Sequence, residues 1–254
     1  MASKSVMTLD RALSRSGWGS RTAAREAIAT GRVKVNGRVV RDPERWVRSG
    51  LDKVCLDDRK LKPSPKIYLA FYKPKGVITS HGDPGARKTV YDFLGGLGRW
   101  VAPVGRLDKD TSGLLLMTND TEFADDVTSP NSGVVKTYWA KINGLLSDET
   151  IAHLAQGIEM KRGDWAHPSS VRRLEDRGKY TWLEIALDEG KNREVRRMIE
   201  AVGFKVLKLV RTRIGGFALG AMTPGQWREL TSGELALIRR PARKRAGQMS
   251  GNAR

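Results

Sequence analysis

A short polar loop between two apolar runs carries the residues best suited to chemistry. It contains Asp108, which lies between the cationic neighbours Arg106 and Lys109, with Gly105 and Gly113 on either side. Nearby positive charge favours the ionised carboxylate, as a carboxylate nucleophile requires. An ordinary turn with an aspartate cap would show the same pattern. The loop by itself therefore makes Asp108 a candidate nucleophile beside that structural alternative.

Other familiar chemistries lack their residue patterns in this chain. The three histidines, His81, His153 and His167, have neither metal-ligand spacing nor a neighbouring cysteine cluster. The sequence has no Gly-x-Ser-x-Gly nucleophile motif, no phosphate-binding glycine loop and no dinucleotide fingerprint. We therefore expect a reaction that uses no metal and no cofactor.

The apolar runs predict the elements that must position Asp108. Strands are expected at residues 67–72, 101–104, 114–118, 137–142, 181–187 and 205–212. A helix is expected at residues 148–156, with Ser147 as its N-cap and Gly157 as its end, and another at residues 193–202. Because strands outnumber helices without regular βαβ alternation, we predict an α+β fold on a mixed sheet.

The first sixty or so residues predict a small separate module. Thr8 is expected to cap a first short helix, and Ser20 a second helix over residues 21–30. Asn36-Gly37 predicts a hairpin turn between short strands. The expected organisation is a module at residues 1–62, a proline-containing linker at 63–66, a larger domain at 67–240 and a basic disordered tail at 241–254.

The chain is strongly basic, which favours a nucleic acid as partner. Its 254 residues include 46 Lys and Arg against 28 Asp and Glu, a formal net charge of +18. Such an excess increases self-repulsion and is typical of proteins that bind a polyanion, although a merely basic soluble protein is the alternative. The single Cys55, the lack of an apolar leader and the lack of a run suited to a membrane helix predict a cytoplasmic protein.

Residues 7–60 resemble the S4-type RNA-binding domain of ribosomal proteins and RNA-modifying enzymes. The segments that carry this resemblance are Leu9-Asp10-Arg11-Ala12-Leu13, Ser20-Arg21, residues 24–28 and Gly31-Arg32-Val33-Lys34-Val35-Asn36-Gly37. The resemblance implies an RNA-facing surface formed by Arg21, Arg25, Arg32 and Lys34. An ordinary solvated face is the alternative, but residues 1–65 are basic in their own right, with 15 Lys and Arg against 7 Asp and Glu.

The loop around Asp108 resembles the signature of the RsuA/RluB-type pseudouridine synthases. That signature, Gly-Arg-Leu-Asp-x-Asp-Thr-x-Gly-Leu-Leu, is matched without a gap by residues 105–115. Further family segments occur in order at Lys73-Pro74-Lys75-Gly76, Lys136-Thr137-Tyr138, residues 189–198, residues 209–215 and residues 225–230. The match spans residues 67–238 and implies a catalytic domain on a mixed, mainly antiparallel sheet after the S4-type domain.

The resemblance also implies the reaction and the residues that perform it. Members of the family isomerise uridine to pseudouridine in structured RNA, without a cofactor. Asp108 would be the catalytic residue, Tyr138 would stack on the flipped base, and Arg196 would pair with Asp108. Leu209 would pack under the pocket, and Arg106 would support it. RNA contacts are expected from the other cations of the motifs, which are Lys73, Lys75, Lys136, Arg193, Arg197 and Arg211.

Each of these roles has a structural alternative, and for Arg196 helix geometry bears on the choice. At about 100° per residue, Val195, Met198 and Ile199 form one apolar stripe, with Arg196 on its shoulder. A long side chain there can bury its stem and direct its charged end into a cleft. A solvated helix face for Arg196, a half-buried strand position for Tyr138 and an ordinary core position for Leu209 are the alternatives.

The substrate and one local contact stay open. Arg193-Glu194 stands where the family usually has His-Gln, which puts the RNA contacts there in doubt but not the nucleophile. We expect a monomer acting on a stem-loop of large-subunit 23S rRNA, with 16S rRNA or tRNA as alternative substrates. A non-catalytic rRNA-binding assembly factor would not need Asp108, Tyr138 and Arg196 together. An RNA hydrolase would need a metal cluster or a histidine pair.

Overall fold

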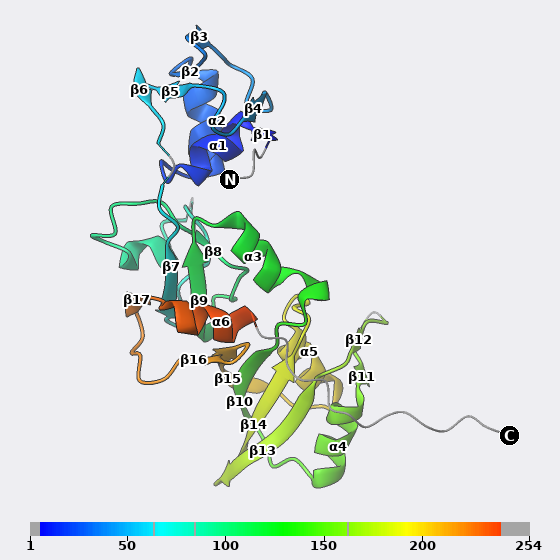
Figure 1. Cartoon of the computed structure of the whole chain (residues 1–254). Coiled ribbons are helices and arrows are strands. Elements are labelled where there is room, and N and C mark those ends of the chain that lie inside the picture. Colours follow the sequence, from blue (N-terminus) through cyan, green and yellow to red (C-terminus); the bar gives the residue numbers. More distant parts are fainter. Residues whose placement is uncertain (1–5, 63, 84, 162, 240–254) are drawn as a thin grey trace, which may run out of the picture. The chain divides into compact units, whose positions relative to one another are not determined.

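The computed structural model describes residues 6–62, 64–83, 85–161 and 163–239 of the chain (Figure 1). Within them the chain divides into two compact units, the first with residues 6–126 and 219–230, the second with residues 127–218 and 231–239. The domain boundaries expected at residues 62 and 67 stay a prediction. The expected basic tail, residues 241–254, lies outside the described residues.

The N-terminal module places two short helices beside a small antiparallel sheet. Its elements are β1 (Val6–Thr8), α1 (Leu9–Arg15), α2 (Arg21–Ala29), β2 (Val33–Val35), β3 (Arg38–Val39), β4 (Trp46–Arg48), β5 (Val54–Leu56) and β6 (Arg59–Lys60). The sheet has the order β3-β2-β5-β6, and β1 pairs separately with β4. Buried residues from both helices and three strands, including Leu9, Ile28 and Val33, form one core.

Two local signals in this module act as expected and one does not. Ser20 Oγ accepts a backbone N–H of the first turn of α2 at 3.1 Å and so caps the helix. Asn36 and Gly37 take φ angles of 50° and 84° in the β2–β3 turn. The predicted cap at Thr8 is wrong, because its hydroxyl donates to Asp10 Oδ1 at 2.5 Å and makes no cap hydrogen bond. A hydrogen bond to the ionised Asp10 carboxylate is stronger than the expected cap hydrogen bond with a neutral backbone N–H.

The rest of the first unit is built around a buried strand. Its elements are β7 (Tyr68–Lys73), the 3-10 helix η1 (Val90–Phe93), β8 (Ala102–Pro103), β9 (Thr111–Thr118), α3 (Thr121–Thr128, whose last two residues belong to the second unit) and β17 (Trp227–Glu229). Strands β9, β7 and β17 are antiparallel neighbours in this order, and β8 also pairs with β9. Every residue of β9 is buried, so this strand is a firm base for the loop that precedes it.

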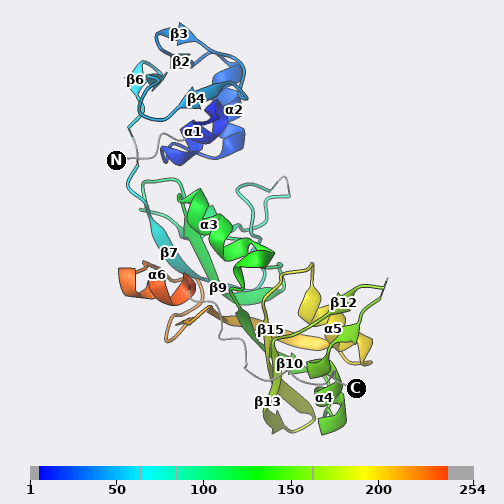
Figure 2. The same ribbon diagram turned by 45° about the vertical axis from the view of Figure 1, so that its right-hand side comes forward.

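The second unit is a twisted antiparallel sheet with helices packed on one face (Figure 2). Its elements are the 3-10 helix η2 (Pro130–Ser132), β10 (Lys136–Ile142), α4 (Asp148–Gln156), β11 (Ile158–Glu159), β12 (Trp165–Ala166), β13 (Ser170–Arg177), β14 (Tyr180–Leu187), α5 (Glu194–Ala201), β15 (Val206–Ile214), β16 (Phe217–Ala218) and α6 (Ser232–Arg239). The strand order is β13-β14-β10-β15, β16 pairs with β15, and β11 and β12 form a separate hairpin. The core between this sheet and helices α4 and α5 includes Ala140, Ile142, Leu154, Leu183, Ile185, Met198 and Leu209.

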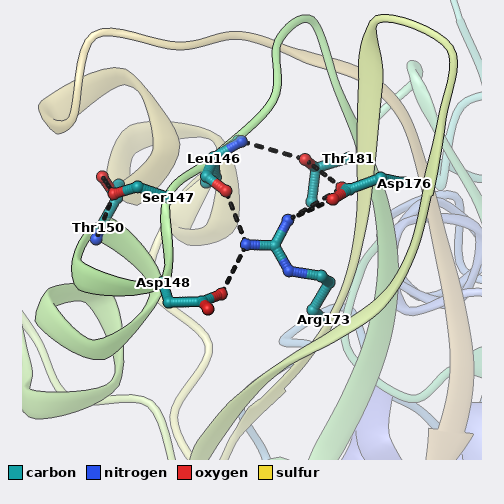
Figure 3. Close-up of polar contacts among 7 residues, drawn as sticks. All are labelled: Leu146, Ser147, Asp148, Thr150, Arg173, Asp176 and Thr181. Atoms are coloured by element: carbon teal, nitrogen blue, oxygen red, sulfur yellow. Dashed lines mark hydrogen bonds and ion pairs between the residues drawn. The ribbon is translucent and has the colours of Figure 1, made fainter.

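Arg173 of β13 ties the loop before α4 to the β13–β14 hairpin (Figure 3). Its guanidinium donates to the carbonyl of Leu146 at 2.6 Å and to Asp148 Oδ1 at 2.8 Å. It also pairs with Asp176 at 2.8 Å. Thr181 Oγ1 donates to Asp176 at 2.7 Å and accepts the N–H of Leu146 at 3.1 Å. This connected set of hydrogen bonds fixes the start of α4 against the hairpin.

The expected α+β architecture is confirmed, with differences in the extent of some elements. Helix α4 has its expected bounds, and Ser147 caps it through the N–H of Thr150. Helix α5 begins and ends one residue inside the expected range, whereas β9 and β15 are longer than expected. Strand β13 and helices α3 and α6 had no counterpart in the sequence prediction. None of the helices in the described part of the chain is long and apolar enough to cross a membrane.

Candidate active site

The loop before β9 holds Asp108 in a half-buried position. The preceding Leu107 is buried, and Thr79 Oγ1 donates to its carbonyl at 2.9 Å and accepts its N–H at 3.3 Å. The N–H of Thr111 donates to the carbonyl of Asp108 at 3.0 Å. Gly105, near the start of the loop, has a φ of 70°, which favours glycine. These contacts fix the backbone on both sides of Asp108 and leave the residue partly exposed.

The structure corrects the prediction that Lys73 contacts the RNA backbone. Its side chain is fully buried, and its ammonium group donates to the carbonyls of Thr111 at 2.8 Å and Pro74 at 3.1 Å. A buried ammonium group is unfavourable without such hydrogen bonds. The N–H of Gly76 adds a bond to the carbonyl of Lys109 at 2.8 Å. The segment after β7 therefore supports the Asp108 loop, and Lys73 does not lie where a phosphate can reach it.

Two other cations of the first unit are accessible. Lys75, in the turn after β7, and Arg106, two residues before Asp108, are both exposed. The bond between Gly76 and Lys109 joins the segments that carry them. The structure thus places Lys75, Arg106 and Asp108 on two loops that a hydrogen bond joins. The predicted RNA contact of Lys75 and the predicted support of the pocket by Arg106 stay predictions.

Strands β10 and β15 bring together candidate residues of the second unit. Tyr138 is half-buried and lies opposite Arg211 in the β10–β15 register. Leu209 is buried and lies opposite Ala140, two residues along each strand. Residues two apart in a strand share a face, so Tyr138, Leu209 and Arg211 lie on the face that packs against α4 and α5. Tyr138 packs against the core there, as the structural alternative of a half-buried strand tyrosine describes, and its role at the flipped base stays a prediction.

Arg196 of α5 occupies the shoulder position that the helical pattern predicts. Its residue exposure is 9%, beside the buried Val195 and Met198. Its Nη1 donates to the carbonyl of Val206 at the start of β15, at 3.0 Å. Arg197 is less buried and donates to Asp164 of the loop between β11 and β12. Of these two arginines, only Arg196 is therefore held inside the unit. Such a fixed position is expected of a residue that orients a partner side chain.

Lys136 and Arg211 lie near one another at one end of the β10–β15 pair. Burial lowers the pKa of Lys136, the positive charge of Arg211 lowers it further, and Asp188 opposes the shift. Arg211 is 5% exposed. This burial favours a supporting role for Arg211 beside Tyr138 over a direct contact with the RNA backbone.

Helix α5 begins with a buried acid whose environment the sequence analysis did not foresee. Glu194 is 4% exposed, and its Oε2 accepts the N–H of Lys191 at 3.1 Å. Burial raises the pKa of Glu194 to about 7, and the neighbouring Glu189 carboxylate adds to the shift. The sequence did contain a signal for it, because Glu194 stands where the family that the chain resembles usually has Gln. Arg193, just before it, is exposed and has a φ of 49°.

Two of the predicted RNA-binding cations of the N-terminal module share one buried acid. Arg21 Nη2 and Arg25 Nε bond Asp10 Oδ2 at 2.7 and 2.9 Å. Burial would raise the pKa of Asp10, but hydrogen bonds from Thr8, Arg21 and Arg25 outweigh it and lower the pKa to about 2. Both arginine side chains keep about half of their exposure, 54% and 49%. The ion pairs therefore orient the two arginines while leaving them partly accessible.

The other two predicted cations of this module have exposed acidic partners. Arg32 pairs with Asp57 and Lys34 with Asp58, each at 2.6 Å. Arg32 directly precedes β2, Lys34 lies on β2, and both acids lie in the β5–β6 turn. Pairing of this kind offsets part of the positive charge that an RNA would meet at Arg32 and Lys34.

Two known families match the two parts of the chain described above, the N-terminal module and the part that carries the Asp108 loop. The sequence profile described as RNA pseudouridylate synthase matches residues 67–201, and that of the S4 domain matches residues 7–53. The chain belongs to the RNA pseudouridylate synthase family, whose members are isomerases. The family resemblance predicted from the motifs is confirmed.

Individual relatives cover most of this chain. It is 41% identical over 231 residues to an uncharacterised RNA pseudouridine synthase of Aquifex aeolicus (strain VF5), covering 91% of this chain and 92% of the relative. It is 39% identical over 233 residues to the ribosomal large subunit pseudouridine synthase B of Bacillus subtilis (strain 168), covering 91% and 95%. The crystal structure of a pseudouridylate synthase matches with a TM-score of 0.66 at 29% identity and covers 91% of this chain and 99% of its own.

Proposed function

We propose that this protein converts one specific uridine of ribosomal RNA to pseudouridine, with large-subunit rRNA as the substrate. We further propose that it acts as a cytoplasmic monomer on a structured stem-loop. The observation that carries the proposal is the unbroken family signature around Asp108, held on a loop whose backbone is fixed on both sides. Relatives named ribosomal large subunit pseudouridine synthase B and the net charge of +18 support the choice of RNA.

The reaction rearranges the nucleoside without an external reactant. The bond from uracil N1 to ribose C1′ breaks, the base turns, and a bond from C5 to C1′ forms. C5 loses a proton and N1 gains one, so atoms and electrons balance. We assign the first step to the Asp108 carboxylate, either as covalent nucleophile or as the base that removes a sugar proton.

The proposal assigns roles to three further residues, as the family resemblance implies. Tyr138 stacks on the flipped base and takes part in proton transfer at C5, as the family resemblance implies. Arg196 pairs with Asp108 and keeps it ionised and oriented. The burial of Arg196 and its bond to the carbonyl of Val206 support this role, because a fixed guanidinium loses little freedom on pairing. Leu209 packs beneath the base.

The proposal requires the target base to leave its stack. Unstacking costs a few kcal/mol, which contacts to phosphates must offset. The cations available for these contacts are the exposed Arg21, Arg25, Arg32, Lys75, Arg106 and Arg193 and the partly exposed Lys34 and Arg197. We assign the S4-type module to RNA binding and the remaining cations to local contacts around the flipped nucleotide.

The test compares rRNA from cells that lack this protein with rRNA from cells that express variants of it. Carbodiimide-adduct primer extension marks pseudouridines as stops. We expect one stop to disappear on deletion, to return with the wild type and not to return with Asp108→Asn. Asp125→Asn, at an exposed position of α3, is the matched control and should restore the stop.

Release of tritium from a [5-³H]uridine transcript by the purified protein checks the chemistry directly, because C5 loses its hydrogen. Asp108→Asn should reduce this release by at least about 10³-fold, as the loss of an essential nucleophile does. Tritium release by Asp108→Asn at the wild-type rate would refute the assignment of Asp108. Persistence of every rRNA stop in the deletion strain, together with release from a tRNA transcript, would move the activity to tRNA.

A further inference from the structure

The sheet of the second unit has a second face, opposite the one that packs on α4 and α5. Side chains alternate along a strand, so the neighbours of the core residues Ala140, Leu183 and Leu209 point away from those helices. The residues on that side include Trp139 and Lys141 on β10, Trp182 and, two residues before it, Tyr180 on β14, and Lys208 on β15. We call these five residues the open sheet face.

Aromatic rings on this face are accessible to a ligand. Trp139 is 44% exposed, and Tyr180 and Trp182 are half-buried. Tyr180 and Trp182 lie two residues apart on one strand, a spacing of roughly 7 Å. Trp139 Nε1 donates to Glu184 Oε2 at 3.1 Å, so its polar atom is already satisfied and its ring is held in place. Two neighbouring rings and a fixed third one form an aromatic platform.

Cations lie against the same rings. Lys141 Nζ is 3.9 Å from the centroid of the Tyr180 ring, and Lys208 Nζ is 6.0 Å from the centroid of the Trp182 ring. Lys141 and Lys208 are opposite one another in the β10–β15 register. In the described part of the chain neither ammonium group is within ion-pair distance of a carboxylate. Both positive charges are therefore available to an anionic ligand.

The chemistry of the face discriminates between a nucleic acid and a protein. Lysine is depleted in the cores of protein interfaces, yet two of the five residues of this face are lysines. Aromatic rings beside unpaired cations are the usual means of binding single-stranded nucleic acid, because every base has a face that can stack and each phosphate carries a charge. The acidic Glu184 is already occupied by Trp139 and by Arg172, which pairs with it at 3.0 Å.

We propose that the open sheet face is an accessory binding site for an unpaired segment of RNA. A base stacks on Trp182, and phosphates meet Lys141 and Lys208. The inference rests on the proposed function in that the ligand is part of the same RNA substrate. It adds a surface on the side of the sheet away from Tyr138 and Leu209, where no chemistry is assigned. The site serves affinity and leaves the isomerisation step to the other face.

The first experiment measures binding of a fluorescein-labelled single-stranded oligouridylate to the full-length protein by anisotropy over a series of KCl concentrations. Trp182→Leu removes the aromatic face and should weaken binding about tenfold, since stacking of one base contributes about 1–3 kcal/mol. Trp182→Phe keeps a ring and should bind nearly as the wild type does. This pair separates stacking from the mere packing of an apolar side chain.

The lysines are tested by the double variant Lys141→Gln/Lys208→Gln. Loss of two phosphate contacts should weaken binding about tenfold and make the slope of log affinity against log salt shallower by about 1.4. The matched control is Lys205→Gln, an exposed lysine before β15 that is not part of the open sheet face, and it should change neither quantity. Should Trp182→Leu fail to fold, the lysine pair decides the question by itself.

A second readout locates the RNA directly, since the N-terminal module also binds it in our proposal. An oligonucleotide with 4-thiouridine should cross-link to the peptide that contains Tyr180 and Trp182, and the lysine double variant should lose this cross-link. Unchanged affinity in Trp182→Leu and in the lysine variant, with cross-links only elsewhere, would overturn the inference. Asp108→Asn protein should bind and cross-link like the wild type, so a failure of the proposed catalytic function is distinguishable from a failure of this site.

Discussion

Two buried acids, each in the first turn of a helix, have opposite ionisation behaviour in this protein. Asp10 is the second residue of α1 in the N-terminal module and is fully buried, while Glu194 begins α5 of the second unit and is 4% exposed. The pKa of Asp10 is lowered to about 2, whereas that of Glu194 is raised to about 7. Burial raises the pKa in both places, so it cannot explain the difference.

The difference lies in the partners. Asp10 receives hydrogen bonds from two guanidinium groups and one hydroxyl, which favour the carboxylate. Glu194 has a second acid, Glu189, as its neighbour, which disfavours a second negative charge. The first arrangement stabilises the fold when ionised, and the second is most stable with a proton on Glu194. The comparison indicates that cations keep Asp10 ionised in the N-terminal module, whereas burial beside Glu189 favours the protonated form of Glu194 at the start of α5.

The largest effect is expected from removing the acid that the two arginines share. Asp10→Asn should destabilise the N-terminal module by about 3 kcal/mol, since it replaces charge-assisted hydrogen bonds with weaker ones at a buried position. Hydrogen exchange of the α1 and α2 amides in the full-length protein measures this loss. Equal protection in Asp10→Asn and in wild type would mean that the arginines do not stabilise the module through Asp10.

A smaller and pH-dependent effect is expected at Glu194. Its folded-state pKa of about 7 exceeds its unfolded value of about 4.5, so folding retains a proton between these values and stability falls as pH rises through that window. Glu194→Gln should match the wild type near pH 4 and be more stable by about 2 kcal/mol near pH 8. Denaturant unfolding at both pH values checks this, with Glu200→Gln, exposed on the same helix, as the control. A stability difference that is the same at both pH values would exclude the raised pKa as its cause.

The smallest effect concerns the exposed pairs of the module. The double variant Asp57→Asn/Asp58→Asn removes the acids that offset the charges of Arg32 and Lys34. It should strengthen RNA binding two- to threefold at low salt, because the two carboxylates no longer repel the RNA phosphates. Both positions have positive φ angles, which asparagine tolerates. Anisotropy with an rRNA stem-loop measures the change, which should vanish at high salt. No change at any salt concentration would indicate that Arg32 and Lys34 face away from the RNA.

The sequence predicted those parts of the fold that short-range chemistry determines. Helix α4 could be placed because Ser147 and Gly157 bracket it, and the β2–β3 turn because Asn-Gly accepts positive φ angles. The shoulder position of Arg196 followed from the spacing of its apolar neighbours. Strand β13 was missed because its sequence, Ser-Val-Arg-Arg-Leu-Glu-Asp-Arg, is charged and shows no apolar alternation.

The parts that could not be predicted depend on contacts between distant residues. Lys73 looked like a surface cation because nothing near it in the sequence shows that the carbonyl of Thr111, 38 residues later, will receive its ammonium group. The failure of the Thr8 cap has the same origin, since the acceptor that captures its hydroxyl is fixed in place by Arg21 and Arg25 from another helix. The motifs identified Asp108 as a candidate, and its catalytic role stays a prediction that the variants above can test.

Strand β13 ends the strand order of its sheet, which bears on how the protein behaves at high concentration. An unpaired strand edge is a template for joining another chain, and natural sheets protect such edges with charge and with bulges. Strand β13 has both, because five of its eight residues are charged and its register with β14 shifts between Arg173 and Glu175. The ion pairs of Arg173 hold this irregular edge in shape. The strand that the sequence analysis missed thus has the charge and the irregular register that disfavour pairing between the sheet edges of separate molecules.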